Sequence, residues 1–261
     1  MIEIYLIFFL FLTNIIFLIF YNKKKIRKFF VKSSIKEVNL ESIDKIFEPI
    51  KKDNLNCPNQ DMFSQLFCIP HEWGVAGMTS EYESWILACI SKKSQNIFEF
   101  GTCSGKTTLL FAANSPDSAK ITSITLNPEQ AKEIIFEEID NKIASRNIIN
   151  ESKYTNFMFS NYPNFEKKIK VIFQDSKELN IENYINKFDL IFIDGGHSYS
   201  CIKNDTEKAL KMIKKNGLIF WHDYSIGKQS HKDVYRYLNE LNSKYKISHI
   251  KFTTLCFLRV E

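Results

Sequence analysis

The chain has 261 residues, enough for one large domain and an appendage. Its hydrophobic fraction of 44% is ordinary for a globular protein, and its net charge is +5. Residues 1–36 carry seven basic side chains and one acidic one, a net charge of +6, so residues 37–261 carry −1. A neutral body argues against a broad nucleic-acid footprint, and we expect no nucleic-acid partner.

The spacing of the cysteines bears on metal binding and disulfide formation. None of the six cysteines forms a C-x-x-C pair, which argues against a zinc knuckle or a disulfide framework. Reduced thiols in a cytosolic domain fit the pattern better.

The first segment is an apolar run from residue 4 to residue 21, interrupted only by Thr13 and Asn14. As a helix it spans roughly 27 Å, near the thickness of a hydrocarbon core. Glu3 precedes the run and no small-residue cleavage site follows it, so an uncleaved anchor is favoured over a signal peptide. A buried helix is the alternative, but no face of the run is polar. We therefore expect residues 1–21 to be a single-pass transmembrane anchor, with the membrane as a partner.

The basic residues after this run favour an anionic lipid surface and place the rest of the chain on the cytoplasmic side. Residues 22–75 read as a basic juxtamembrane linker and irregular segment, with one short helix around residues 40–50.

From Thr79 onward, strands and helices alternate, with a capping box at residues 80–83 and Pro128 at a helix start. The expected strands cover residues 96–100, 121–126, 170–174, 190–193, 218–221, 247–252 and 255–260. This alternation predicts a Rossmann-like, doubly wound α/β domain over residues 76–261, with a mostly parallel seven-stranded sheet. The last two strands are joined too tightly for a helical crossover, so the last strand should be antiparallel. Residues 140–168 read as one long irregular insertion.

The first motif is E-x-G-x-x-x-G, in which Glu99 ends a strand and Gly101 and Gly105 flank a turn into a helix. Small residues there let a ligand approach the backbone at the carboxyl edge of the sheet. The competing interpretation is a nucleotide-binding P-loop, but that loop needs four residues between its glycines and this turn has three. Lys106 is then expected to point to solvent from the first helical turn.

Two further motifs follow buried strands. Asp194 and His197 lie in D-G-G-H-S-Y, and His222 and Asp223 lie in W-H-D-Y. Neighbouring parallel strands therefore present an acid and a histidine each at the edge where such sheets bind ligands.

In this order and spacing, the three motifs resemble a bacterial branch of class I S-adenosylmethionine-dependent methyltransferases, the methyltransferase domain 24 type. This branch is related to catechol and macrolide-sugar O-methyltransferases, and the resemblance covers about residues 76–261. It implies that S-adenosylmethionine is the cofactor. The residues that match its binding positions are Glu99, Gly101, Thr102, Gly105, Thr125, Asp175, Ser176 and Asp194.

By the same resemblance, Asp194 and Asp223 match acids that bind a divalent metal, commonly Mg²⁺, and His197 matches a general base, so Asp194 and His197 are the expected catalytic residues. The chemistry is consistent, because a hard cation lowers the pKa of a hydroxyl and an imidazole can take its proton. Each acid has an alternative role as a strand-end cap or cofactor contact. His197 has an alternative role in a structural hydrogen bond, and His222 is expected to be an inward structural residue.

One position departs from the family pattern. Thr125 stands where an acid should accept both ribose hydroxyl protons, and a neutral hydroxyl accepts less strongly than a carboxylate. Asn127 and Glu129 are the candidate substitutes.

The sequence thus predicts a methyltransferase that O-methylates a hydroxyl of a small molecule or glycan with divalent-metal assistance. The alternatives are a metal-independent methyltransferase with another acceptor, and a membrane-tethered binding protein that has lost catalysis. The sequence names neither the acceptor nor the oligomeric state.

Overall fold

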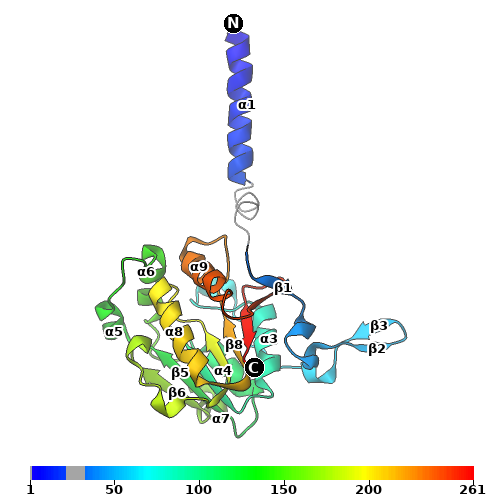
Figure 1. The fold of residues 1–261 in the computed structure, drawn as a ribbon, viewed down its shortest axis with the longest axis vertical. Coiled ribbons are helices and arrows are strands. Elements are labelled where there is room, and N and C mark those ends of the chain that lie inside the picture. Colours follow the sequence, from blue (N-terminus) through cyan, green and yellow to red (C-terminus); the bar gives the residue numbers. More distant parts are fainter. Residues whose placement is uncertain (1, 22–32) are drawn as a thin grey trace.

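The computed structural model describes residues 2–21 and 33–261, and it contains an α/β body with one mixed sheet (Figure 1). The strand order is β1-β9-β10-β8-β7-β4-β5-β6. The strands are β1 (Lys36–Val38), β4 (Asn96–Phe100), β5 (Lys120–Thr125), β6 (Ile169–Phe173), β7 (Phe188–Ile193), β8 (Ile213–Trp221), β9 (Ser248–Ile250) and β10 (Cys256–Arg259). The helices are α1 (Ile2–Tyr21), α3 (Glu81–Ser91), α4 (Lys106–Asn114), α5 (Pro128–Glu133), α6 (Lys142–Glu151), α7 (Pro163–Glu166), α8 (Tyr199–Met212) and α9 (Lys232–Leu241).

The central strands β4, β7 and β8 pair in parallel, and their carboxyl-terminal halves are buried and mostly apolar, as expected of strands covered on both faces. Alternate residues of one strand enter different cores: Phe98 packs in the core that holds side chains of α8 and α9, and Ile97 in the core that holds those of α3 and α4. The Rossmann-like, doubly wound α/β architecture is therefore confirmed. Strand β10 runs antiparallel to both β8 and β9, also as predicted.

The predicted number of strands is wrong, because the sheet has eight strands and not seven. The additional strand is β1, which pairs in parallel with β9 at the edge of the sheet. Strand β1 is only three residues long, which is too short for a recognisable alternation of apolar and polar residues. It forms a strand because it pairs with the exposed edge of β9. It comes from the segment that was predicted to be a linker.

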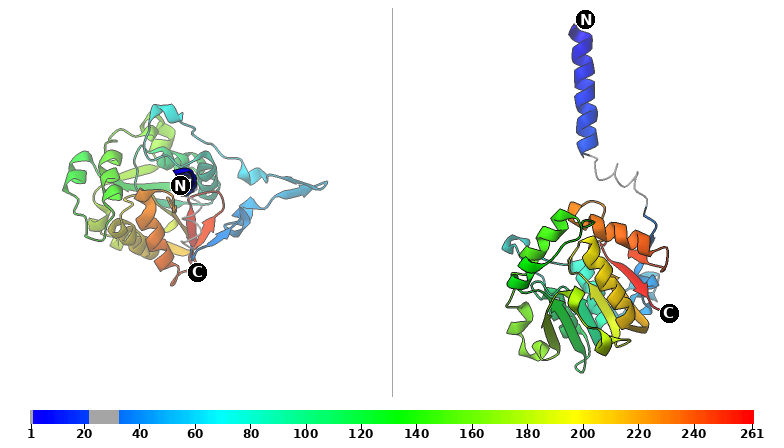
Figure 2. Two further views of the ribbon diagram at one scale, coloured as in Figure 1. Left: turned by 90° about the horizontal axis from the view of Figure 1, so that it is seen from above. Right: turned by 60° about the vertical axis from the view of Figure 1, so that its left-hand side comes forward.

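Other local predictions also need correction. The short helix expected around residues 40–50 is two separate 3-10 turns, Leu40–Ser42 and Lys45–Phe47. The insertion at residues 140–168 is not irregular, since it holds α6, a 3-10 turn at Met158–Asn161, and α7. A hairpin of β2 (Ile50–Lys52) and β3 (Leu55–Cys57) projects from the body (Figure 2, left).

Within residues 2–21 and 33–261, no helix combines the length and the apolar character needed to cross a membrane. This finding overturns the predicted transmembrane helix, and with it the predicted membrane localisation and membrane partner.

Candidate functional site

The candidate site lies at the carboxyl edge of the sheet, where β4, β7 and β8 end side by side. The register pairs Phe100 with Ile193 and Ile193 with Trp221, so the three strands end at the same level. The next residues are Gly101 after β4, Asp194 after β7, and the His222–Asp223 pair after β8. The parallel topology thus brings the three sequence motifs to one place.

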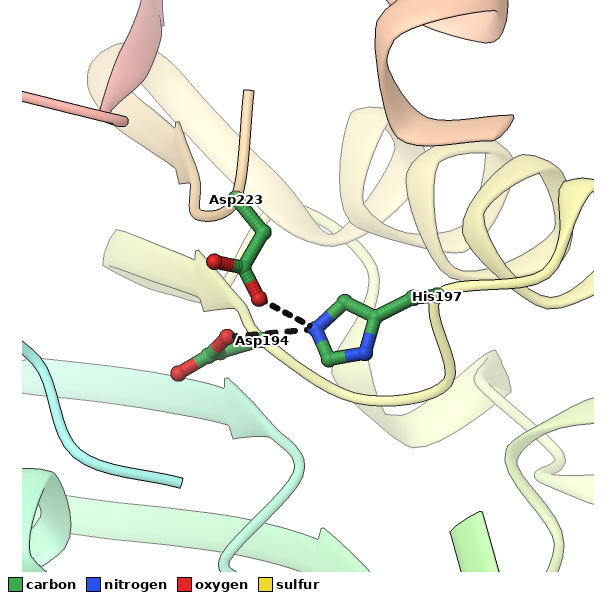
Figure 3. Close-up of side chains that lie close together, drawn as sticks. All are labelled: Asp194, His197 and Asp223. Atoms are coloured by element: carbon green, nitrogen blue, oxygen red, sulfur yellow. Dashed lines mark ion pairs between the residues drawn. The ribbon is translucent and has the colours of Figure 1, made fainter. Parts of the chain in front are cut away.

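Asp194, His197 and Asp223 form a compact, partly buried cluster (Figure 3). His197 Nε2 lies 2.8 Å from Asp223 Oδ2 and 3.7 Å from Asp194 Oδ1. One ligand atom from each residue lies within 4.8 Å of those of the other two, a spacing that a single metal ion can bridge. The His197 ring is 8% exposed, and neither ring nitrogen makes a well-aligned hydrogen bond within the described residues. A buried imidazole without an aligned partner is an arrangement typical of functional sites.

A second histidine approaches the same acids. His222 Nδ1 lies 3.0 Å from Asp194 Oδ1 and 3.4 Å from Asp223 Oδ1. On the other side of its ring, Nε2 lies 3.4 Å from Glu83 Oε2. His231 Nε2 lies 3.3 Å from Asp223 Oδ1. The two aspartates are therefore surrounded by three imidazoles.

Burial and charge act in opposite directions on these pKa values. Burial alone would lower the pKa values of His197 and His222, but the neighbouring aspartates outweigh it and hold both pKa values well above 6.5. Burial alone would raise the pKa of Asp223, but the two histidines hold it well below 3.8. For His231 burial prevails and lowers the pKa to about 4. The site is therefore a mutually stabilised set of opposite charges.

Two adjoining cavities open at this edge. The first cavity has a volume of about 70 Å³, and its apolar wall includes Ile124, Ile134 and Ile148. The second cavity has a volume of about 230 Å³ and is lined by the Asp194–His197–Asp223 cluster together with His222 and His231. The residues common to both linings are Gly101, Cys103, Glu151 and Asp194. A ligand in the first cavity can therefore reach a group held in the second.

Most of the residues predicted to bind the cofactor line these cavities. The first cavity is lined by Gly101, Thr125, Asp175, Ser176 and Asp194, and the second by Thr102. All eight assignments remain predictions.

Glu99 and Gly105 lie outside both linings. Glu99 is 1% exposed and accepts hydrogen bonds from the hydroxyls of Ser123 and Thr108, and burial raises its pKa to about 8. Gly105 has a φ of +81° at the start of α4, and a Cβ there would lie 2.9 Å from the Phe159 ring. Both residues therefore have protein groups as their neighbours and contribute to the structure around the turn.

Gly101 is required by a close approach between two strand ends. Its φ is +96°, and a Cβ there would lie 2.4 Å from the carbonyl oxygen of Asp194 and 2.6 Å from Cα of Gly195. Only a residue without a Cβ lets the turn after β4 lie against the backbone that carries Asp194.

The substitutes considered for the ribose-binding acid are engaged elsewhere. Asn127 caps α5 by accepting hydrogen bonds from the backbone N–H groups of Glu129 and Gln130. Glu129 pairs with Lys132 on the surface. Thr125 lines the first cavity, whereas Asn127 and Glu129 are not part of its lining.

Several residues at the site were not predicted. Glu151 lines both cavities, and burial raises its pKa to about 7. Asp205 lines the first cavity from α8, and burial raises its pKa to about 6. Glu83 was seen only as a capping residue, yet it also contacts His222. No motif contains Glu151 or Asp205, and each reaches the first cavity only through the packing of its helix, α6 for Glu151 and α8 for Asp205.

The predicted exposure of Lys106 is wrong. It was expected to point to solvent, but it is 3% exposed, and its Nζ donates to the Thr79 carbonyl at 2.8 Å. It lines the second cavity, and burial lowers its pKa. The segment before α3 folds over the start of α4 and covers this side chain.

Comparison with known proteins gives a family and a fold. Residues 98–224, which run from the E-x-G motif to W-H-D-Y, match a family model described as a methyltransferase domain. This match confirms the predicted S-adenosylmethionine-dependent methyltransferase family and enzyme class. No curated protein matches the sequence.

Among solved structures, the chain is similar to a protein from Staphylococcus aureus assigned as a caffeoyl-CoA O-methyltransferase, with 19% identity and a TM-score of 0.52 over 72% of this chain and 88% of that one. It is also similar to a protein from Klebsiella pneumoniae assigned as an O-methyltransferase, with 14% identity and a TM-score of 0.50 over 73% and 86%. A third is the Podospora anserina methyltransferase PaMTH1 bound to S-adenosylhomocysteine, with 15% identity and a TM-score of 0.50 over 71% and 80%. At these identities the likeness shows the fold.

Proposed function

Since residues 98–224 place this chain in the methyltransferase-domain family, we propose that it methylates a hydroxyl oxygen of a small molecule or sugar with the help of a divalent ion. The observation that carries the proposal is the Asp194–His197–Asp223 cluster, whose ligand atoms lie within 4.8 Å of one another beside the first cavity. A hydroxyl is a poor nucleophile at neutral pH, and this cluster holds both kinds of group that activate one.

The first cavity is suited to S-adenosylmethionine, which supplies the electrophilic methyl group. Its lining combines an apolar wall with polar side chains that could hold the ribose, the adenine and the amino-acid part of the cofactor. Thr125 would accept from the ribose hydroxyls, and Asp175 and Ser176 would flank the adenine. The Gly101 turn would bring the methionine part close to Asp194. The proposal is thus that cofactor and acceptor meet where the two cavities join.

The donor set of the second cavity is suited to a divalent ion. Asp194 and Asp223 would bind it, and it would lower the pKa of an acceptor hydroxyl. In the ion-free chain the two aspartates keep His197 protonated. An ion bound to these aspartates would lower the pKa of His197, and Nε2 would then accept the hydroxyl proton. The remaining requirement is alignment of the acceptor oxygen with the methyl carbon and sulfur, which the rigid strand ends provide.

The proposal is tested in two steps. Calorimetric titration of the chain with S-adenosylhomocysteine should show binding in the micromolar range, about −8 kcal/mol. Once an acceptor is found, His197→Ala should lower turnover by about 10²–10⁴-fold and leave cofactor affinity unchanged. Binding without any turnover in a broad acceptor screen would favour a binding protein, an alternative that Thr125 in place of an acid supports. Absence of binding would refute the cofactor site.

A further inference from the structure

His222 lies where an additional metal ligand would lie. Ligands about 2.1 Å from one ion are separated by about 3.0 Å at a right angle and about 3.4 Å at a tetrahedral angle. His222 Nδ1 lies 3.0 Å from Asp194 Oδ1 and 3.4 Å from Asp223 Oδ1, so its distances to both acids match these separations. His222 is 8% exposed, so the surrounding protein holds its ring in position.

The other side of the His222 ring has the partner that a ligating histidine requires. Its Nε2 lies 3.4 Å from Glu83 Oε2. The aspartates keep His222 protonated in the ion-free chain, and an ion bound to them would replace the Nδ1 proton while the Nε2 proton stays directed at Glu83. Glu83 is itself held in place, because its Oε1 accepts from the backbone N–H of Thr254 at 2.6 Å and from its hydroxyl at 2.9 Å. This carboxylate–histidine arrangement is the usual support of a metal-bound imidazole.

His197 occupies a different place relative to the same acids. Its Nε2 approaches the other carboxylate oxygen of Asp223, Oδ2, and lies 3.7 Å from Asp194 Oδ1. No carboxylate lies within hydrogen-bond reach of its Nδ1, which is buried without a partner among the described residues. His197 thus has the position of a base beside the ion, and His222 has the position of a ligand.

We propose that the divalent-ion site is formed by Asp194, Asp223 and His222 Nδ1, and that it selects a transition-metal ion over Mg²⁺. Imidazole is a good ligand for Zn²⁺, Fe²⁺ and similar ions, whereas Mg²⁺ prefers oxygen ligands only. The inference rests on the metal role in the proposed function. It assigns His222, which was expected to be structural, to the ion.

The test uses calorimetric titration of the purified chain with Co²⁺ and with Mg²⁺, together with the visible spectrum of the Co²⁺ complex. Co²⁺ should bind at least tenfold more tightly than Mg²⁺. His222→Asn places an amide oxygen near the former Nδ1 position, and it should weaken Co²⁺ binding about 10–100-fold while leaving Mg²⁺ binding intact or stronger. Glu83→Gln should weaken Co²⁺ binding by a similar factor and provides the answer if His222→Asn does not fold.

Two histidine variants are the controls. His71→Asn, at an exposed position, and His197→Asn should leave Co²⁺ affinity within about threefold. An unchanged Co²⁺ to Mg²⁺ ratio in both His222→Asn and Glu83→Gln overturns the inference while the metal role survives. A loss confined to His197→Asn also overturns it and makes His197 the ligand. Failure of both ions to bind refutes the metal role itself. The methyltransferase assignment is tested separately, by the titration with S-adenosylhomocysteine.

Discussion

Replacement of Gly101 by alanine tests how the fold sets the position of Asp194. A Cβ at Gly101 would lie 2.4 Å from the carbonyl oxygen of Asp194, so the two strand ends must separate by roughly 1 Å to reach ordinary contact. The positive φ of +96° adds about 1–2 kcal/mol of backbone strain, and overpacking adds about 1–3 kcal/mol. We expect Gly101→Ala to lower the free energy of unfolding by about 3 kcal/mol, or Tm by about 10 °C.

Gly74 offers a matched control for the backbone term. It also has a positive φ, +62°, but a Cβ there would meet nothing within 4 Å. Gly74→Ala should therefore cost only about 1 kcal/mol, or about 3 °C in Tm. Thermal melts of both variants distinguish the cost of overpacking from the cost of backbone strain. At the assay temperature, the Gly101→Ala enzyme should also have a turnover roughly 10²-fold lower, because Asp194 has moved. Equal melting temperatures for the two variants, or normal turnover in Gly101→Ala, would show that the close approach does not set the site.

Two further predictions concern the cofactor edge. Glu99 has a folded-state pKa of about 8 against an ordinary value of 4.5, so between these pH values the folded state holds a proton that the unfolded state has released, and stability falls as pH rises. Glu99→Gln should therefore gain stability over the unsubstituted chain by up to roughly 1.4 kcal/mol per pH unit between pH 5 and pH 8 in urea unfolding; parallel stability curves would contradict the buried, protonated state. Thr125→Asp should tighten S-adenosylhomocysteine binding about tenfold in calorimetry, because a carboxylate accepts from ribose hydroxyls more strongly than a hydroxyl does; unchanged affinity would mean that Thr125 does not face the ribose.

The sequence was sufficient to predict the sheet core and the site cluster. Strands β4 and β7 are apolar runs with clear ends, and the residue after each end is the one that matters for the site. Since parallel strands end at one edge, Asp194 and Asp223 were expected to be neighbours, and both contact His197 in the structure. Predictions of this kind succeed because they depend on local pattern plus one rule of topology.

The residues that were missed depend on tertiary contacts. Glu83 precedes the first motif and reaches His222 only because α3 packs beside the end of β8, at a separation of 139 residues along the chain. Glu151 becomes a cavity residue through the placement of α6, and Lys106 is buried by a segment that has no periodic pattern. In each case the surroundings of a charged side chain are set by chain that is distant in sequence, and composition or spacing does not contain that information.

One carboxylate outside the three motifs, that of Glu83, holds two parts of the site in place. Asp223 has a φ of +61°, a left-handed conformation that costs energy in a residue with a side chain, and its N–H donates to the Thr254 hydroxyl at 3.3 Å. That hydroxyl donates in turn to Glu83, the same carboxylate that faces His222. Glu83 therefore fixes both the imidazole ring and the loop that aims Asp223. Loss of Glu83 would release two sides of the acid cluster at once, which is why its effect on ion binding should exceed that of a surface carboxylate of equal charge.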